Sequence, residues 1–205
     1  MDQTVQRVAR LNEIGISLSV ERDTSIVCEK ILQGAMELTH ADGGSLYRMS
    51  DDSQALEFVI VANHSLDIHM GGSSGGDINF YPVQLFIDGK ANTSMVVSCA
   101  VHEDRTINIP DAYDVEGFDF SGTRQFDKKT GYRTQSILTV PMKNHEGEII
   151  GVLQLINAKD RQGKTKEFST EECDLAESLA SQAAVARPCP AVPQCERVLR
   201  IDAEP

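Results

Sequence analysis

The chain has 205 residues, of which 40% are hydrophobic, and its formal net charge is −12. This length is enough for one buried core, so we expect a single domain. A nucleic-acid partner is not expected, because binding to phosphates needs clustered Lys and Arg. There is no run of about 18 apolar residues to span a membrane, and the first residues lack the basic and apolar regions of a signal peptide. We therefore expect a cytoplasmic protein with no membrane contact.

Two helices and then two strands are predicted in the first third of the chain, over residues 4–19, 24–38, 45–49 and 56–62. Both helices have apolar residues at three- and four-residue spacings, the pattern of an amphipathic helix. Asp23 or Thr24 is a candidate N-cap for the second helix. Residues 40–44 contain two glycines and are expected to separate that helix from the first strand.

The rest of the chain begins with a weakly patterned stretch, 63–92, and ends with a hairpin and a helix. A short helix over 93–101 and a short strand over 106–109 come first. The hairpin strands 136–142 and 149–156 follow, and then a helix that begins at the Ser-x-x-Glu sequence of residues 169–172. Both hairpin strands are apolar on both faces, which indicates a sheet covered on each side. Gln154 interrupts this pattern and is expected to be a polar group aimed at something buried.

This order of elements predicts an α+β fold with a central, mostly antiparallel sheet. Helices are expected to pack on one face, and the loop-rich insertion to cover the other face and leave a lidded ligand pocket. After residue 186 the prolines of the segment 187–205 cannot continue a helix. That segment is expected to be a tail or linker, or the end of a fragment.

Four blocks of the sequence resemble a known family. They are His40–Tyr47, Asn108–Tyr113, Thr130–Thr134, and the strand pair 136–142 with 151–157. The chain from about Val8 to Ala186 resembles a GAF domain, of the subgroup found in cyclic-nucleotide phosphodiesterases and bacterial adenylyl cyclases. The resemblance implies a sensor of small molecules with no catalysis of its own. It also implies three segments: an N-terminal signalling or dimerisation helix (1–22), the GAF domain (23–186) and the tail (187–205).

The resemblance implies a ligand such as cAMP or cGMP and a set of residues around it. The residues implied to line the pocket are Ser45, Val96, Val97, Asp127, Thr130, Tyr132, Thr134 and Gln154. Asp127 is not expected to hold the phosphate, because two anions repel. Backbone N–H groups at a helix N-terminus and the threonine hydroxyls are the expected phosphate partners. The cysteines and histidines lack the spacing of a zinc site, so no metal and no other cofactor is expected.

A further signature of the subgroup is altered in this chain. Asn157 and Phe168 match it, but the lysine lies one place late, at Lys159, and Glu172 stands where the family has an aspartate. In the family this motif forms a salt bridge that ties the last helix to the sheet. We expect an ion pair between Lys159 and Glu172 to take its place.

Two functions remain open from the sequence. The first is a regulatory module that binds cAMP or cGMP and signals through its flanking helices to an output domain, such as a cyclase, phosphodiesterase or kinase. The second is a ligand-free GAF scaffold for dimerisation and protein–protein interaction. A homodimer formed by helix bundling is expected in either case, because isologous dimers are the commonest assemblies. No arrangement of a nucleophile with its base, or of paired carboxylates, indicates an enzyme.

Overall fold

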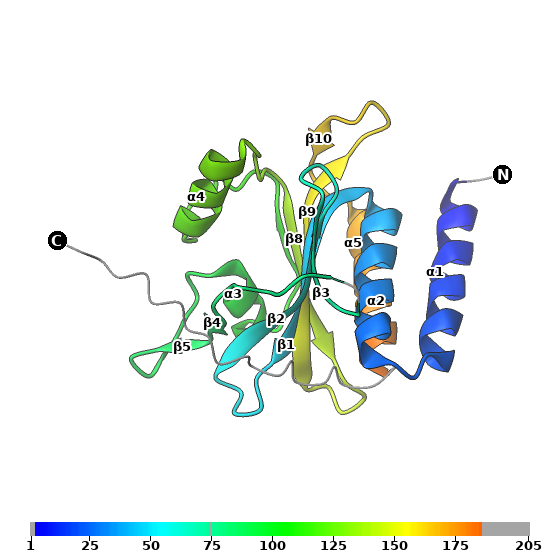
Figure 1. Ribbon diagram of the computed structural model, residues 1–205, viewed down its shortest axis with the longest axis horizontal. Coiled ribbons are helices and arrows are strands. Elements are labelled where there is room, and N and C mark those ends of the chain that lie inside the picture. Colours follow the sequence, from blue (N-terminus) through cyan, green and yellow to red (C-terminus); the bar gives the residue numbers. More distant parts are fainter. Residues whose placement is uncertain (1–2, 74, 186–205) are drawn as a thin grey trace.

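The computed structural model describes residues 3–73 and 75–185, and their side chains from Val5 to Gln182. The described helices are α1 (Gln3–Val20), α2 (Thr24–Thr39), α3 (Val96–His102), α4 (Ser121–Thr130) and α5 (Thr170–Val185). The sheet separates α2 and α5 on one face from α3 and α4 on the other, and α1 lies outside α2 (Figure 1). The predicted tail over 187–205 lies outside the described residues. No helix in the described part of the chain is both long and apolar enough for a membrane span.

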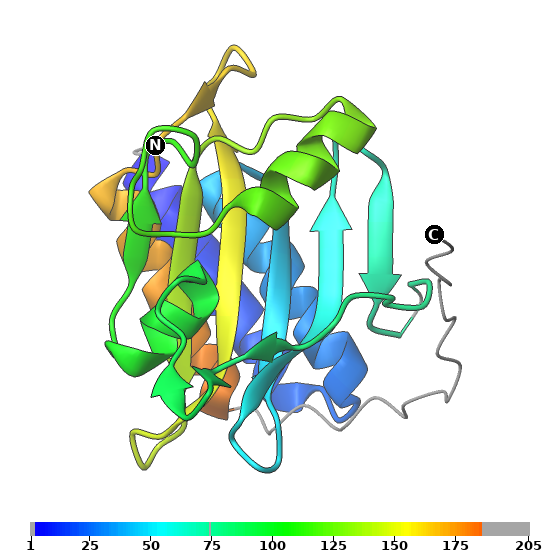
Figure 2. The same cartoon turned by 90° about the vertical axis from the view of Figure 1, so that its left-hand side faces the viewer.

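The central sheet is antiparallel, in the order β3-β2-β1-β9-β8-β7. Its strands are β1 (Ala41–Met49), β2 (Ala55–Asn63), β3 (Ile68–Gly71), β7 (Ile107–Ile109), β8 (Ile137–Lys143) and β9 (Ile149–Lys159). Two short strands extend it, β4 (Val83–Gln84) beside β2 and β10 (Thr165–Lys166) beside β9. A separate small hairpin is formed by β5 (Phe86–Ile87) and β6 (Lys90–Ala91). Figure 2 views the sheet from the face that carries α3 and α4. The predicted α+β class with an antiparallel sheet is confirmed.

The main core lies between the sheet and the helices α2 and α5. Leu32 of α2, Leu155 of β9 and Leu179 of α5 are fully buried there. At the start of α2, the Asp23 carboxylate accepts a hydrogen bond from the Ser25 backbone N–H at 2.8 Å, which confirms Asp23 as the N-cap. His40 ends the same helix in the left-handed conformation, with φ of 53°. The chain turns there directly into the sheet.

The first strand is longer than the sequence predicted. It begins at Ala41, not at residue 45, because the two glycines are themselves part of the ladder between β2 and β9. A Cβ on Gly44 would lie 2.8 Å from both the Gln154 carbonyl oxygen and the Leu32 side chain. These residues therefore act as strand positions that allow close packing of α2, and the prediction that they only break the helix was wrong.

The ion pair predicted between Lys159 and Glu172 is also wrong. Glu172 accepts hydrogen bonds from the Ser169 N–H at 2.9 Å and the Ser169 hydroxyl at 3.0 Å, so the predicted capping box is confirmed. Its cationic partner is Lys166. The chain reverses after β9, and β10 places Lys166 opposite Ala158, beside the start of α5. Lys159 instead lies 3.8 Å from Asp42.

Candidate functional site

A cavity of about 420 Å³ lies on the sheet face that α3 and α4 cover. Strands β1, β2 and β9 contribute residues to it, together with the segment 80–83, the start of α3, and α4. Helix α4 crosses in front of the sheet in Figure 2, and residues of both line the cavity. The cavity is of the size usual for small-molecule sites, and it lies where the sequence predicted a lidded pocket.

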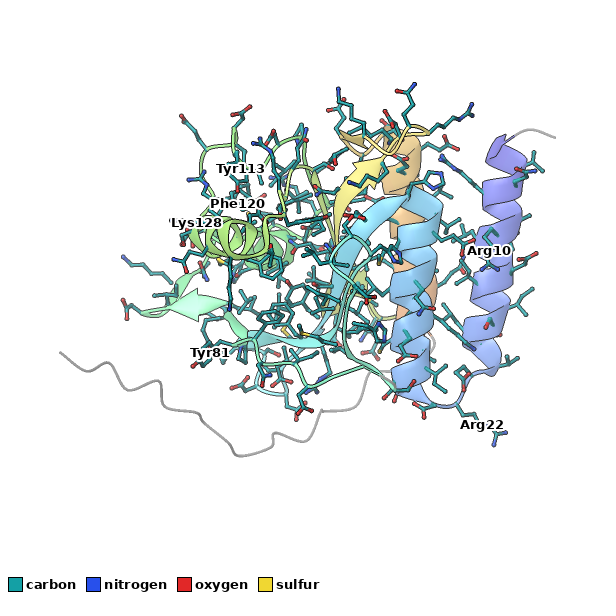
Figure 3. All side chains as sticks on the ribbon, turned by 45° about the horizontal axis from the view of Figure 1, so that its top comes forward. Arg10, Arg22, Tyr81, Tyr113, Phe120 and Lys128 are labelled. Atoms are coloured by element: carbon teal, nitrogen blue, oxygen red, sulfur yellow. The ribbon has the colours of Figure 1, made fainter. Side chains whose placement is uncertain are left out.

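Aromatic rings form much of the cavity wall. The Tyr47 ring lies 4.4 Å from that of Phe58, which lies 5.2 Å from that of Phe80. Phe120 contributes from the α4 side, and Tyr81 is 89% exposed. Figure 3 shows Phe120 beside α4 and Tyr81 at the outer edge of the molecule. Rings disposed in this way offer flat apolar surfaces to a planar ligand.

Five of the predicted site residues line this cavity. They are Ser45, Val96, Val97, Thr134 and Gln154. Gln154 lies on β9, where its amide donates to the Thr139 hydroxyl at 3.0 Å and its carbonyl accepts from the Tyr47 hydroxyl at 3.4 Å. The prediction that this polar group points into a buried region is therefore confirmed. The hydroxyls of Ser45 and Thr134 come from opposite sides of it, on β1 and before β8.

Asp127 does not line the cavity, although it was predicted to contact the ligand. It is 4% exposed, and its carboxylate accepts from the Thr134 N–H at 2.7 Å and the Thr134 hydroxyl at 2.9 Å. The Tyr113 hydroxyl donates to it as well, at 3.0 Å. With three donors around it, Asp127 fastens the end of α4 to the segment that enters β8. It positions Thr134 beside the cavity.

Thr130 and Tyr132 also lie outside the cavity lining. The Thr130 hydroxyl donates to the Phe126 carbonyl at 2.8 Å and accepts from the Tyr132 N–H at 3.3 Å, within the turn that ends α4. The Tyr132 hydroxyl donates to the Asp42 carboxylate at 2.7 Å. Burial, and then this hydrogen bond, raise the pKa of Tyr132 above its usual value. Tyr132 therefore keeps its proton at neutral pH and links the end of α4 to β1.

Asn157 holds the segment that carries Thr134. Its carbonyl oxygen accepts from the Gln135 N–H at 2.7 Å, and its amide donates to the Arg133 carbonyl at 2.7 Å. The residue has φ of 57°, a left-handed conformation that asparagine tolerates better than most side chains. Asn157, a matched position of the family signature, does not line the cavity. It acts from β9 by holding the segment that places Thr134 in the lining.

Sequence reasoning missed several residues of the cavity. The polar ones are Asn63, Asp119 and Thr123. Asp119 carried a readable signal, because it lies two residues before Ser121 and its carboxylate accepts from the Ser121 N–H at 2.8 Å. Hydrogen bonds from the Ser121 hydroxyl and from its backbone N–H lower the pKa of Asp119. Asn63 carried no signal, since its place in the cavity follows from how β2 lies beside β1.

The residues that line the cavity suit a ligand held by uncharged polar groups better than a ligand held by an ion pair. Among the described residues that line the cavity, Asp119 is the one that carries a charge at neutral pH. A bound anion would therefore be held by hydroxyls and backbone N–H groups, not by Lys or Arg. In the part of the chain that the structure describes, no group of three or more His, Cys, Asp or Glu side chains is placed to hold a metal ion.

Comparison with known proteins agrees with this geometry. Among solved structures, the GAF domain from a phosphoenolpyruvate-protein phosphotransferase of Coxiella burnetii superposes on the sheet and its helices with a TM-score of 0.65. It is 14% identical, and the match covers 89% of this chain and 93% of that chain. The model of the GAF domain family matches residues 23–186. The chain belongs to the GAF domain family.

Relatives in sequence are cyclic-nucleotide phosphodiesterases. The dual 3',5'-cyclic-AMP and -GMP phosphodiesterase 11A of Takifugu rubripes is 32% identical over 145 residues, which is 71% of this chain and 15% of that protein. The cGMP-specific 3',5'-cyclic phosphodiesterase of Drosophila sechellia is 33% identical over 142 residues, 67% of this chain and 11% of that protein. The chain thus spans less than a sixth of the length of these relatives.

Proposed function

We propose that this chain is a regulatory module that binds a purine cyclic nucleotide, cAMP or cGMP, in the cavity beneath α4. The observation that carries the proposal is the cavity itself, with aromatic walls and hydroxyl and amide groups converging from β1, β9 and the segment before β8. The two phosphodiesterase relatives, whose names contain these nucleotides, support the same ligand class. The module has no catalysis of its own in this proposal, and acts in the cytosol.

In the proposed complex the purine lies against the aromatic wall formed by Tyr47, Phe58 and Phe80, since planar rings stack favourably. Thr134 and Gln154 meet the polar edges of the ligand. The phosphate faces the Ser45 hydroxyl of β1, because the Asp119 carboxylate, which accepts from the Ser121 N–H at the start of α4, would repel a second anion there. This arrangement keeps the phosphate from needing a basic side chain.

Binding is proposed to change the packing of the helices that flank the domain. Helices α1 and α5 both pack on the far side of the sheet from the cavity, and α1 is held to α5 by the Arg7–Glu171 ion pair at 3.2 Å. The output domain would continue from this helix layer. Such control requires that the ligand bind two states of the domain with different affinities.

A ligand-free scaffold is the second candidate, and one observation supports the dimer on which it would depend. The outer face of α1 carries four exposed apolar side chains, Val5 (56%), Val8 (46%), Ile16 (67%) and Val20 (72%). Val5, Ile16 and Val20 lie on the face opposite Leu11, Ile14 and Leu18, which pack into the core, and Val8 lies on the flank between the two faces. An apolar stripe of this kind fits a helix–helix contact between two copies of the chain.

Calorimetric titration of the chain with cAMP and with cGMP tests the proposal. We expect saturable heat at one nucleotide per chain for at least one of the two. Thr123→Trp places a large side chain in the cavity and is expected to abolish that heat. Gln125→Trp adds the same side chain to an exposed position of α4 and is expected to leave it unchanged. No heat with either nucleotide would remove the ligand proposal and leave the scaffold.

A further inference from the structure

The hydroxyl of Thr134, which lines the cavity under α4, has a fixed hydrogen-bond direction. Its oxygen lies 2.9 Å from Oδ1 of Asp127, while Oδ2 of Asp127 accepts from the Thr134 N–H at 2.7 Å and from the Tyr113 hydroxyl at 3.0 Å. A carboxylate has lone pairs but no hydrogen to donate, so the hydrogen of the Thr134 hydroxyl points at Asp127. Within the described part of the chain, no hydrogen bond is donated to the Thr134 hydroxyl oxygen. Toward the cavity, this oxygen can therefore only accept.

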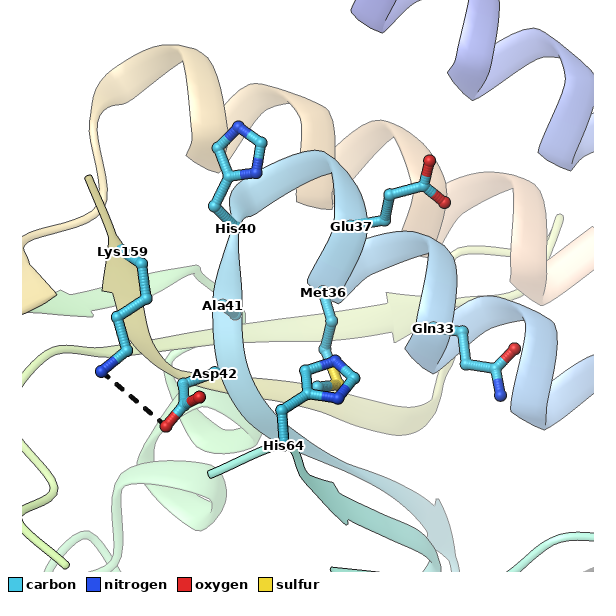
Figure 4. A pocket seen from close by; sticks show the side chains of 8 residues that line it. All are labelled: Gln33, Met36, Glu37, His40, Ala41, Asp42, His64 and Lys159. Atoms are coloured by element: carbon cyan, nitrogen blue, oxygen red, sulfur yellow. Dashed lines mark ion pairs between the residues drawn. The ribbon is translucent and has the colours of Figure 1, made fainter. Parts of the chain in front are cut away.

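The chain around Thr134 is held in place as well. Asn157 bonds the peptide groups on both sides of Thr134, at 2.7 Å each. Two residues before it, the Tyr132 hydroxyl donates to Asp42 at 2.7 Å. Figure 4 shows Asp42 at the start of β1, with its carboxylate 3.8 Å from the ammonium group of Lys159. Because the backbone is fastened at these points, the hydroxyl keeps its place in the cavity wall.

The two purines of cAMP and cGMP differ in hydrogen-bond direction along one edge of the base. At position 6 the amino group of adenine donates, whereas the carbonyl oxygen of guanine accepts. At position 1 the order is reversed, since adenine has a lone pair and guanine an N–H. At position 2 the amino group of guanine donates, and adenine has a C–H. A wall group that can only accept therefore suits one of the two bases, whichever of these positions it faces.

We propose that Asp127 is a positioning residue that makes the cavity select between the two nucleotides. It orients the Thr134 hydroxyl, whose oxygen then accepts from an N–H group of the purine. The nucleotide that donates at Thr134 is bound more tightly, because the other one places a lone pair or a C–H against the same oxygen. This inference rests on the proposed function, since it requires a cyclic nucleotide in the cavity.

The test is calorimetric titration of wild type and Asp127→Asn with cGMP and with cAMP. In this variant the amide oxygen keeps both bonds of Oδ2, while the amide nitrogen takes the place of Oδ1 and donates to Thr134. The Thr134 hydroxyl can then donate into the cavity. We expect the wild type to bind one nucleotide about tenfold or more tightly than the other. The variant is expected to lower this ratio about tenfold or to reverse the preference.

Two further substitutions make the test specific. Thr134→Val removes the hydroxyl with little change of shape, and its ratio is expected to lie between those of wild type and Asp127→Asn. It carries the test if Asp127→Asn proves unfolded. Asp174→Asn makes the same carboxylate-to-amide change at an exposed position of α5 and is expected to leave the ratio unchanged.

The outcomes separate this inference from the proposed function. A wild-type preference below about threefold would overturn the inference and leave the function. The same follows if Asp127→Asn or Thr134→Val weakens both nucleotides by one factor, which is the result that a purely structural role gives. Binding of neither nucleotide to the wild type would remove the proposed function and this inference with it.

Discussion

Asp127 was predicted to contact the ligand, but in the structure it holds the end of α4 through hydrogen bonds. Its carboxylate is buried and accepts from Thr134 and Tyr113. Tyr113 is itself flanked by two guanidinium groups, since those of Arg133 and Arg124 lie 4.6 Å and 5.4 Å from the centre of its ring. Figure 3 shows Tyr113 and Lys128 in the region around α4. The buried carboxylate of Asp127 thus ties the end of α4 to the body of the domain.

Asp127→Ala is expected to lower the free energy of unfolding by about 3 kcal/mol, because it leaves the donors of Thr134 and Tyr113 without their acceptor. Urea unfolding followed by circular dichroism measures this change. Lys129→Ala removes an exposed side chain from the same helix and is expected to change stability by less than about 0.5 kcal/mol. Equal stability of the two variants would contradict the role given to Asp127.

Glu172 is expected to make stability depend on pH. Burial acts to raise the pKa of its carboxyl, but hydrogen bonds from Lys166 and Ser169 outweigh burial and hold the pKa below its usual value. A lowered pKa in the folded state gives stability that is fully present above the unfolded value of about 4.3 and is lost as pH falls through the folded value.

Urea unfolding between pH 7 and pH 3 checks this expectation for the wild type and for Glu172→Gln. The variant is expected to be less stable at pH 7, by about 1–3 kcal/mol, and the difference is expected to shrink as the pH falls through the range below about 4.3. Glu167→Gln, at an exposed position, serves as the control. A difference that is constant across this pH range would contradict the assignment.

At the scale of elements, the fold could be predicted wherever a segment carried its own pattern. The stripes of α1 and α2, the paired apolar strands β8 and β9, and the capping box of α5 each signal their element locally. Helix α4 could not be predicted in this way. Its sequence, SGTRQFDKKT, is polar almost throughout, and its contacts with the domain come from Phe126 and Asp127.

The residues of the candidate site also differ in whether the sequence could predict their position. Residues on strands, such as Ser45 and Gln154, have their direction fixed by alternation along the strand, and both line the cavity. Thr130 and Tyr132 lie in the turn after α4, where direction depends on distant partners such as Asp42. The predicted ion pair of Lys159 with Glu172 was wrong for a related reason. The chain reverses into β10 after β9, and the spacing of residues along the sequence does not reveal that reversal.

Asn157 offers a test of how β9 shapes the segment before β8. Asn157→Ala removes two hydrogen bonds and also leaves a Cβ at φ of 57°, so we expect a loss of about 2–3 kcal/mol. Asn157→Gly removes the same bonds without the backbone strain. Its loss of stability is expected to be about 1 kcal/mol smaller than that of the alanine variant. Chemical denaturation measures both variants. A glycine variant less stable than the alanine variant would contradict this account.

At the scale of the whole molecule, the layers separate the cavity from the helices that would carry a signal. The cavity lies on one face of the sheet, and α2, α5 and α1 lie on the other (Figure 1). The strands β1 and β9 take part in both, since their residues form cavity lining on one side and core on the other. In the function we propose, a change at the cavity would reach the helix layer through these two strands.

A homodimer through the outer face of α1 is expected from its exposed apolar stripe. The double substitution Ile16→Glu with Val20→Glu is expected to shift a dimer to monomer, because it places charge in an apolar contact. Sedimentation equilibrium measures the change in mass. Gln125→Glu adds negative charge elsewhere on the surface and is expected to leave the mass unchanged. A wild-type chain that is monomeric at high micromolar concentration would contradict the dimer.

The location of the ligand is the central claim, and an amide NMR titration with cGMP and cAMP tests it most directly. We expect saturable shifts at residues that line the cavity, including Ser45, Val97, Thr134 and Gln154, for at least one nucleotide. The same shifts are expected to be absent in Thr123→Trp. No saturable shift with either nucleotide, or shifts gathered away from these residues, would contradict the account.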